Sequence, residues 1–145
     1  MRLTLQADYA LRMLMHLAVN EDRLGTIAEV ADRFAISRNH LTKVANRLAQ
    51  AGHVDAVRGR SGGLRLARPA DRINLGAVVR PLEQGHALVE CFPGGTDDCL
   101  ITRCCKLKGV LARAQEAFFA VLDEYSVADL TVGNRALESL LEEVA

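Results

Sequence analysis

The sequence lacks the features that mark a membrane protein, a secreted protein or a large enzyme. No hydrophobic run approaches the ~18 residues of a membrane-spanning helix, and no basic and then apolar leader opens the chain. At 145 residues it is too short for a TIM barrel or a two-domain enzyme. It has no catalytic His–carboxylate pairing, phosphate-binding loop, cofactor fingerprint or internal repeat. We therefore expect a compact cytoplasmic protein without enzymatic activity or membrane contact.

The chain also lacks net charge, but its charges are unevenly distributed. Lys and Arg number 18 in total, as do Asp and Glu. Residues 1–75 carry 12 basic and 7 acidic side chains, whereas residues 76–145 carry 6 and 11. Within residues 37–72 there are 8 basic side chains and only 2 acidic ones. This asymmetry indicates either a polyanionic partner for the first half or a basic face that is simply solvated.

The first fifty residues have the pattern of a helix-turn-helix. Apolar residues recur at three- and four-residue spacings over 5–20, which predicts an amphipathic helix. Thr26 and Glu29 form a capping-box signature that starts a second helix over 26–35. Ser37 is expected to cap a third helix, with Gly52 as its left-handed stop. Two short helices joined by a tight turn favour a helix-turn-helix.

A basic hairpin is expected to follow these helices. Residues 53–58 and 64–67 are typical of short strands, and the glycine-rich segment 59–63 of the turn between them. A further helix is expected over 74–84. This order predicts a mainly α protein in which residues 1–84 form a winged helix-turn-helix that binds double-stranded DNA. The alternative is an exposed hairpin whose arginines only aid solubility.

The DNA contacts are expected at the start of the third helix and at the wing. A recognition helix presents its first turns to the major groove, while an arginine-bearing hairpin suits a minor groove or a phosphate track. Each of these side chains could instead be merely solvated. The candidates are Ser37, Arg38, Asn39, His40 and Lys43 in the helix, and Arg58 and Arg60 in the wing.

The second half of the chain contains a narrow helical seam. Between residues 105 and 125 apolar side chains recur at spacings of 4, 3, 4, 3 and 4, at Leu107, Leu111, Ala114, Phe118, Val121 and Tyr125. Such an a/d seam favours a long C-terminal dimerisation helix over an intramolecular core. We expect residues 106–145 to hold this helix and the C-terminal helices, including a last one over 134–144.

All four cysteines lie within 15 residues, in the loop expected over 85–105. Their spacing is Cys-x7-Cys-x4-Cys-Cys, from Cys91 to Cys105. Clustered thiols on such a loop favour metal or redox chemistry over disulfides. Zinc sites prefer paired arms, which are missing apart from the adjacent Cys104 and Cys105, whereas iron–sulfur clusters accept irregular spacings. An iron–sulfur site is the first expectation; a thiol switch, zinc and inert thiols stay open.

Four segments carry a family resemblance: MRLTLQADYALRML, SRNHLTKVANRLAQAGHVDAVRGRSGGLRLARPADRI, CLITRCCKLK and YSVADL. The chain resembles the bacterial winged-helix repressors that sense through an iron–sulfur cluster, the family containing NsrR, IscR and RirA, and its nitric-oxide-sensing members most. The resemblance implies a homodimer with a long crossed helix, a cluster beside it, and two wings reading a palindromic operator. Nitric oxide is the implied effector.

The resemblance also implies the ligands. Cys91, Cys99 and Cys105 match the family's three cysteine ligands, and Asp8 matches a carboxylate supplied from the partner subunit's first helix. A 4Fe–4S cluster is implied, with 2Fe–2S as the alternative. Without the resemblance, Asp8 would be an ordinary acidic residue near a helix N-terminus. Cys104 is additional, and could replace Cys105 or complete a site of four thiolates.

Three alternative functions stay open. The gap between Cys91 and Cys99 is as long as in the iron-responsive relatives, so the signal could be iron or cluster supply. A cluster-free regulator could instead close a disulfide on oxidation. A small redox enzyme carrying a cluster would leave the basic wing unexplained. The sequence does not identify the operator or the target genes.

Overall fold

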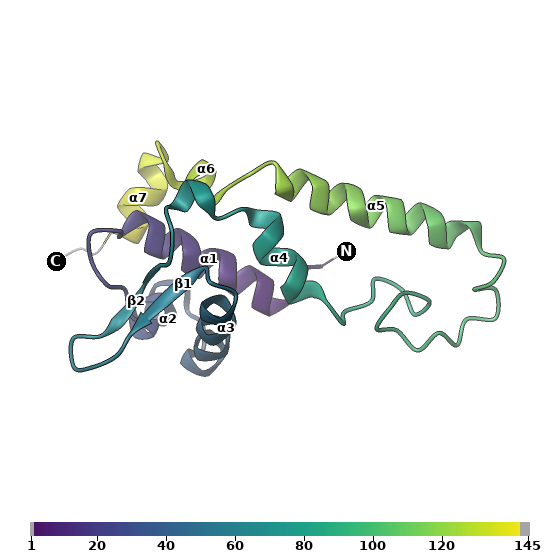
Figure 1. The fold of residues 1–145 in the computed structure, drawn as a ribbon, viewed down its shortest axis with the longest axis horizontal. Helices are drawn as coiled ribbons and strands as arrows, with labels where there is room; N and C mark the ends of the chain where they lie inside the picture. The colour runs from purple at the N-terminus through teal and green to yellow at the C-terminus, as the bar shows by residue number, and fades with distance from the viewer. Residues whose placement is uncertain (1, 143–145) are drawn as a thin grey trace.

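The computed structural model describes residues 2–142 as a compact head and a long arm (Figure 1). The arm is helix α5 with the loop that precedes it, and the head contains the remaining elements. The elements are α1 (Leu5–Val19), α2 (Ile27–Phe34), α3 (Arg38–Gln50), β1 (Val54–Val57), β2 (Gly63–Leu66), a 3-10 turn (Ala70–Arg72), α4 (Leu75–Glu83), α5 (Lys106–Asp123), α6 (Val127–Thr131) and α7 (Arg135–Leu141).

Helix α1 is the centre of the head. Its apolar residues fall on one face, and Ala10, Met13 and Leu14 are completely buried. Thr4 begins the helix by accepting a hydrogen bond from the Ala7 N–H at 3.2 Å. Helices α3, α4 and α6 all pack against α1. The helix predicted over 5–20 is confirmed to within one residue.

Helices α2 and α3 form the predicted helix-turn-helix. The capping box is present: the Thr26 hydroxyl accepts from the Glu29 N–H at 3.2 Å, and the Glu29 carboxylate accepts from the Thr26 N–H at 3.0 Å. Gly52 follows α3 with a φ of +73°, as a left-handed stop requires. Ser37 occupies the N-cap position as expected, but its side chain makes no capping hydrogen bond, and only its backbone carbonyl accepts from Leu41.

The wing, residues 54–66, is an antiparallel hairpin with Val54 opposite Leu66 and Val57 opposite Gly63. Glycine is required at position 62, because a Cβ there would lie 2.2 Å from the Val57 carbonyl oxygen. The backbones of Gly25 and Leu64 exchange hydrogen bonds of 2.9 and 2.7 Å. The wing is therefore fixed to the segment that leads into α2.

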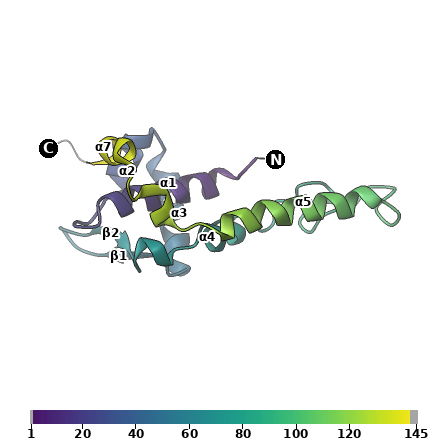
Figure 2. The same cartoon turned by 90° about the horizontal axis from the view of Figure 1, so that it is seen from above.

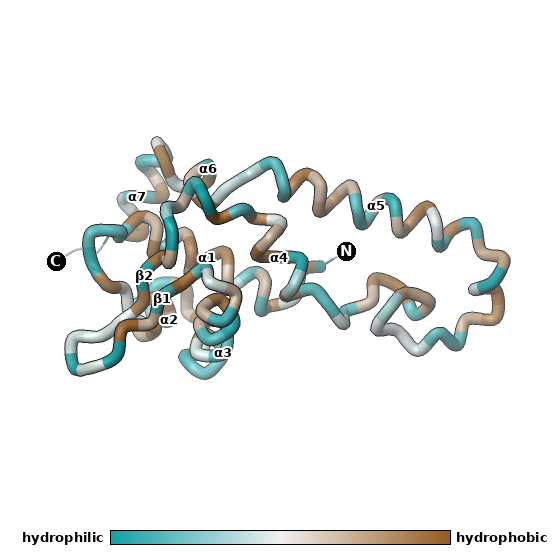
Figure 3. Tube along the Cα trace, viewed as in Figure 1, coloured by the Kyte–Doolittle hydropathy of each residue, from teal (hydrophilic) through white to brown (hydrophobic). Residues whose placement is uncertain are grey.

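Helix α5 is attached to the head through α4. Asn74 caps α4 and also donates to the carbonyl of Asp123 at 2.7 Å. Arg80 donates two hydrogen bonds to Glu116, at 3.2 and 3.0 Å, and lies over the Phe119 ring. Seen from above, α5 runs beyond the head, and no residue of this helix is buried within the described chain (Figure 2). Hydrophobic residues recur along this exposed arm (Figure 3).

The chain returns to the head after α5. The Ser126 hydroxyl accepts from the Asp129 N–H, and Asp129 accepts in turn from the Ser126 N–H, so that α6 begins with a second capping box. Val127 and Leu141 are buried, and both α6 and α7 pack against α1. The helix predicted over 134–144 extends from Arg135 to Leu141, and its expected last residues lie outside the described part of the chain.

Candidate functional site

The predicted recognition residues lie together on the exposed first half of α3. Ser37, Arg38 and Asn39 are all exposed. The Arg38 guanidinium lies 3.5 Å from the Asp32 carboxylate at the end of α2, and both side chains are mostly exposed. An ion pair so open to water is weak, so the guanidinium can exchange it for a phosphate or a base edge.

His40 and Lys43 are exposed on the side of α3 that faces α1. The His40 ring lies 6.2 Å from the Tyr9 ring, measured between centroids. Both His40 and Lys43 line a groove between the two helices.

Two polar residues of α3 were missed from the sequence. Thr42 and Asn46 are exposed and share a helix face with Asn39 and Lys43. The sequence shows them, because Asn39, Thr42 and Asn46 are polar residues spaced three and four apart.

The two predicted wing arginines occupy the exposed end of the hairpin. Arg58 and Arg60 are exposed, and among residues 2–142 neither forms an ion pair or a side-chain hydrogen bond. Arg65 differs, since its guanidinium lies 3.5 Å from Asp55 on the opposite strand. The wing therefore has two arginines without an ion pair at its tip, Arg58 and Arg60, and a third, Arg65, beside Asp55 on its strands.

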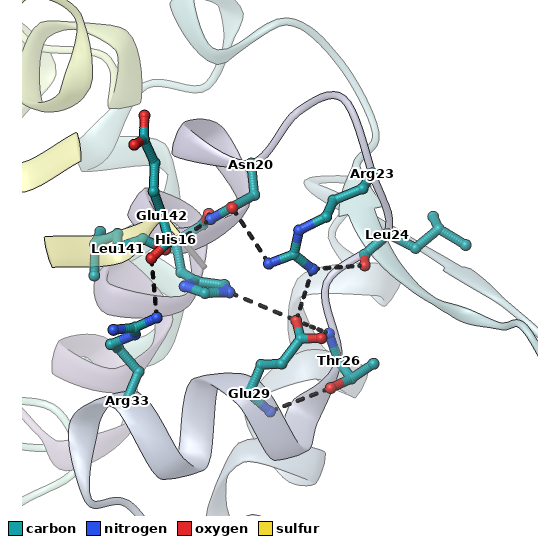
Figure 4. Close-up of polar contacts among 9 residues, drawn as sticks. All are labelled: His16, Asn20, Arg23, Leu24, Thr26, Glu29, Arg33, Leu141 and Glu142. Atoms are coloured by element: carbon teal, nitrogen blue, oxygen red, sulfur yellow. Dashed lines mark hydrogen bonds and ion pairs between the residues drawn. The ribbon is translucent and has the colours of Figure 1, made fainter. Parts of the chain in front are cut away.

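A polar network fixes α2, and with it the recognition helix, to α1 (Figure 4). His16 is almost completely buried and points toward the Glu29 carboxylate, 3.9 Å away. Burial lowers the His16 pKa, although Glu29 opposes the shift. Burial alone would raise the Glu29 pKa, but hydrogen bonds from the Thr26 backbone and from Arg23, at 3.0 Å, lower it. Glu29 is therefore ionised, and it joins α2 to Arg23 and to the start of its own helix.

The C-terminal segment closes the same network. Asn20 donates to the Leu141 carbonyl at 3.1 Å, and Arg33 donates to the Glu142 carbonyl at 3.1 Å (Figure 4). Helix α7 is thus tied to both α1 and α2. Of the other histidines, His53 is buried with a pKa lowered by burial, and His86 is exposed.

The cysteine loop is organised by backbone contacts around its glycines. A Cβ at position 95 would lie 2.2 Å from the Glu90 carbonyl oxygen, so only glycine fits there. Phe92 is buried, and the Asp97 N–H donates to the Glu90 carbonyl at 2.9 Å. These contacts close a compact turn next to Cys91.

The structure does not gather the cysteines into a finished site. All four thiols are free; Cys91, Cys99 and Cys105 are half-buried and Cys104 is exposed. Within residues 2–142 no three His, Cys, Asp or Glu side chains are placed to hold one metal ion. The donor chemistry nevertheless suits an iron–sulfur cluster, because thiolates are its usual ligands.

Asp8 lies in the first turn of α1. Its carboxylate is 38% exposed and lies 2.9 Å from the Arg12 guanidinium. Within residues 2–142 Asp8 is not placed with the cysteines of its own chain to hold a metal ion.

Comparison with known proteins identifies the family. A family model described as "Rrf2: Iron-dependent Transcriptional regulator" matches residues 3–133. The chain belongs to the Rrf2 family. This Rrf2 protein is 43% identical over 143 residues to the HTH-type transcriptional regulator NsrR of Shouchella clausii (strain KSM-K16), covering 98% of this chain and 96% of that protein. Its identity to the regulator of that name from Geobacillus kaustophilus (strain HTA426) is 43%, covering 99% and 98%.

Solved structures agree with the family assignment at the level of fold. IscR of T. potens aligns with a TM-score of 0.70 at 24% identity, covering 90% of this chain and 85% of that one. The cysteine regulator CymR of B. subtilis aligns with a TM-score of 0.69 at 22% identity, covering 90% and 95%. The predicted winged-helix fold is confirmed. The relatives of this Rrf2 protein are DNA-binding transcriptional regulators and not enzymes. None of the helices in residues 2–142 is long and apolar enough to cross a bilayer.

Proposed function

We propose that this Rrf2 protein is a homodimeric transcriptional repressor that senses nitric oxide through an iron–sulfur cluster and then releases its operator. The observation that carries the proposal is the identity of 43% over nearly the full chain with regulators named NsrR. The grouping of all four cysteines in the loop before α5 supports it, because it supplies the thiolates that such a cluster needs.

DNA binding is assigned to residues 1–84, which form the winged helix-turn-helix part of the head. Arg38 and Asn39 can each make bidentate contacts with base edges in the major groove, whereas Lys43 holds a phosphate. Ser37 and His40 complete this surface, and Arg58 and Arg60 reach the flanking minor groove. A twofold-symmetric dimer presents two such heads, so the operator is palindromic.

Dimerisation is assigned to the arm, in the segment 106–145. Leu107 and Val121 on α5 are 59% and 54% exposed within the single chain, which is costly for large aliphatic side chains unless a partner covers them. Both belong to the a/d seam predicted from the sequence. A second copy of α5 is the occupant with matching spacing.

The loop 85–105 would hold the cluster. Cys91, Cys99 and Cys105 are the proposed thiolate ligands, with Cys104 as a substitute, and Asp8 of the partner subunit completes the set. We infer a 4Fe–4S cluster, with 2Fe–2S as the alternative. When bound, the cluster supplies iron atoms that react with nitric oxide. A carboxylate is a weaker ligand for such irons than a thiolate, so the Asp8 side marks the more open iron.

The chain's own residues connect this loop to the DNA-binding surface. The loop begins directly after α4 and ends at α5, and Arg80 clamps these two helices together. A loop that holds the cluster would fix the position of α5 relative to α4. In a dimer joined through α5, it would therefore fix the distance between the DNA-binding heads of the two subunits. Releasing the loop would let that spacing relax. Moving an operator from mostly bound to mostly free requires about 5 kcal/mol of difference between two such arrangements.

A second candidate is a repressor of the same family that responds to iron or cluster supply. The family model is described as iron-dependent, which favours this reading of the signal. The assignments of the DNA-binding residues and of the ligands would not change.

The test is native mass spectrometry of strictly anaerobic protein, combined with absorbance and operator binding during a nitric oxide titration. The proposal expects a dimer with four irons and four sulfides per chain that loses its cluster absorbance and its operator together as nitric oxide is added. A cluster that resists nitric oxide but is lost to an iron chelator would favour the iron-responsive alternative. A metal-free dimer that is released from DNA by oxidant would favour a thiol switch.

A further inference from the structure

A groove of about 470 Å³ lies between the end of the recognition helix α3, the base of the wing and helix α4. Its apolar lining includes Leu48, Val78 and Leu82, which belong to the core of the head. No acidic side chain is among its described lining residues. Its volume is in the range of small-molecule sites, which combine an apolar lining with a few polar groups.

One polar group of this groove is buried without a partner. His53 lines the groove and is only 9% exposed, and its Nδ1 makes no hydrogen bond within the described chain. Burial lowers the His53 pKa, and the positive charge of Arg68 lowers it further, so that the ring is uncharged at neutral pH. Leaving such a nitrogen unpaired is costly. It therefore points to a hydrogen-bond partner that the chain itself does not supply.

A second unpaired group comes from the proline inside α4. Pro81 has no N–H, so the carbonyl of Ala77, four residues earlier, lacks the helical hydrogen bond that it would otherwise accept. Residues four apart lie on the same face of a helix, and both Ala77 and Pro81 line the groove. The groove therefore has a backbone acceptor on the α4 side.

The groove also has one guanidinium. Arg47 is exposed in the last turn of α3 and lines the groove. Its side chain forms no ion pair or hydrogen bond within residues 2–142. Because no acidic side chain balances it among the described lining residues, the groove is positively charged. A guanidinium binds a carboxylate through two parallel hydrogen bonds.

We propose that this groove binds a small aliphatic carboxylate that carries a hydroxyl group. The carboxylate pairs with Arg47, and the alkyl chain lies against Val78 and Leu82. The hydroxyl group donates to one of the two open acceptors, the Ala77 carbonyl or His53 Nδ1. An amino group suits the groove less well, because an ammonium would lack an acidic partner there.

The position of the groove gives such a ligand a second effect. It lies against the end of α3 and the start of the wing, which are the two elements assigned to DNA, and against α4. A ligand that contacts all three holds the recognition helix and the wing in one arrangement. We expect this restraint to strengthen operator binding, because a surface that is already ordered loses less entropy on binding.

The direct test uses 2-hydroxyisocaproate as the probe and the anaerobic, full-length protein labelled with ¹⁵N. Amide chemical shifts are followed by nuclear magnetic resonance as the probe is added. The proposal expects saturable shifts centred on residues 47–53 and 77–84. Isocaproate, which lacks the hydroxyl, and 2-hydroxyisocaproamide, which lacks the charge, should each bind roughly tenfold more weakly. No saturable shift at millimolar probe, or shifts centred elsewhere, would overturn the proposal.

Substitutions test the two polar walls separately. Arg47→Gln should weaken probe binding by about tenfold or more, because it removes a charge-assisted pair. Arg72→Gln is the matched control, since this exposed arginine of the 3-10 turn does not line the groove. Pro81→Ala gives the Ala77 carbonyl its helical partner, so it should weaken probe binding while raising the unfolding temperature. A probe affinity unchanged in both Arg47→Gln and Pro81→Ala would overturn the proposal.

Operator binding tests the effect on DNA. Fluorescence anisotropy at fixed salt should show several-fold tighter operator binding in the presence of the probe. Ala77→Phe, which fills the groove from an exposed position, should abolish this response. An operator affinity that the probe leaves unchanged in the unsubstituted protein would overturn the regulatory role. Because neither measurement uses nitric oxide, a failure of the nitric oxide response would leave both outcomes as they are.

Discussion

At the scale of single residues, buried histidines make the stability of the head depend on pH. Burial lowers the pKa of His16 and of His53 below the ordinary 6.5. As the pH falls, the unfolded chain therefore takes up these protons before the folded one does, and stability is lost below that value. Glu29 acts in the same direction at lower pH, because its pKa is lowered in the folded state. Acidification should therefore destabilise the head progressively.

We expect His16→Leu to weaken this pH dependence. Both imidazole nitrogens of His16 are buried without a hydrogen bond within the described chain, so the substitution removes polar atoms that gain little there. Urea unfolding of the metal-free protein at about pH 7.5 and about pH 5.5 measures the effect, since these values bracket the ordinary histidine pKa. The stability difference between the two pH values should shrink in His16→Leu and stay unchanged in His86→Leu, where the side chain is exposed. An unchanged difference in both variants would mean that folding does not lower the pKa of His16.

The wing arginines give a second prediction at this scale. Arg58→Ala should weaken binding to a selected operator by ~1–3 kcal/mol at fixed salt, the range for one lost groove contact. Arg65→Ala is the matched control, because it removes the same charge from a strand of the wing instead of from its tip. Fluorescence anisotropy over a range of salt concentrations measures both. Equal losses for the two variants would indicate a general charge effect instead of a specific contact by Arg58.

At the scale of elements, the contact between α4 and α5 determines how the arm leaves the head. Arg80 is hydrogen-bonded to Glu116 and Asp123, which raises its pKa further above its ordinary value, and its guanidinium carbon lies 4.8 Å from the centre of the Phe119 ring. We expect Arg80→Ala to speed amide hydrogen exchange in the last half of α5 and to leave α3 unchanged. Arg80→Lys should restore little, because lysine lacks the planar fork that binds Glu116 through two nitrogens.

Hydrogen-exchange mass spectrometry of the Arg80 variants also separates local from global effects. Faster exchange limited to α5 would identify the clamp as the link between arm and head. Faster exchange throughout the head would mean instead that Arg80 supports the whole fold.

The elements themselves were largely predictable, because local rules govern them. Thr26 with Glu29 and Asn74 with its following turn cap helices through contacts within three residues, which a sequence displays directly. The return of α6 and α7 onto α1 was not predictable, since it depends on distant contacts such as Asn20 with Leu141. Ser37 shows the limit of a local rule: its position at the start of α3 was predictable, but its hydroxyl makes no capping hydrogen bond.

The candidate site also has a part that the sequence predicts and a part that it does not. The recognition helix and the wing tip follow from helical and hairpin periodicity, so their exposed residues could be named in advance. The cysteines could be found by their clustering, but their arrangement could not, because the loop of 85–105 is shaped by backbone contacts such as those around Gly95. The ligand set that we propose to be shared between two chains would leave no local pattern in the sequence.

At the scale of the whole molecule, the arm exposes large apolar side chains that a second subunit would cover. Helix α5 contacts the head with Phe119 and Leu122, while Val121 and Tyr125 remain 54% and 46% exposed on another face. That face carries the seam with alternating spacings of four and three, which is the pattern of paired helices. The exposed seam residues Val121 and Tyr125 would therefore be covered in a dimer.

Val121→Glu should consequently separate the dimer without unfolding the chain. A carboxylate in the centre of a paired seam must be buried twice in a symmetric dimer, once from each subunit, and the cost of burying unpaired charges exceeds that of leaving the helices apart. Ala120→Glu is the matched control, because it adds the same side chain at the adjacent exposed position, outside the seam. Light scattering after size exclusion should give a monomer for Val121→Glu and a dimer for Ala120→Glu, with equal helical circular dichroism. Because a single head contacts only half of a palindrome, Val121→Glu should also lose the affinity that two linked heads provide. A Val121→Glu protein that remained dimeric would place the subunit interface on a different surface.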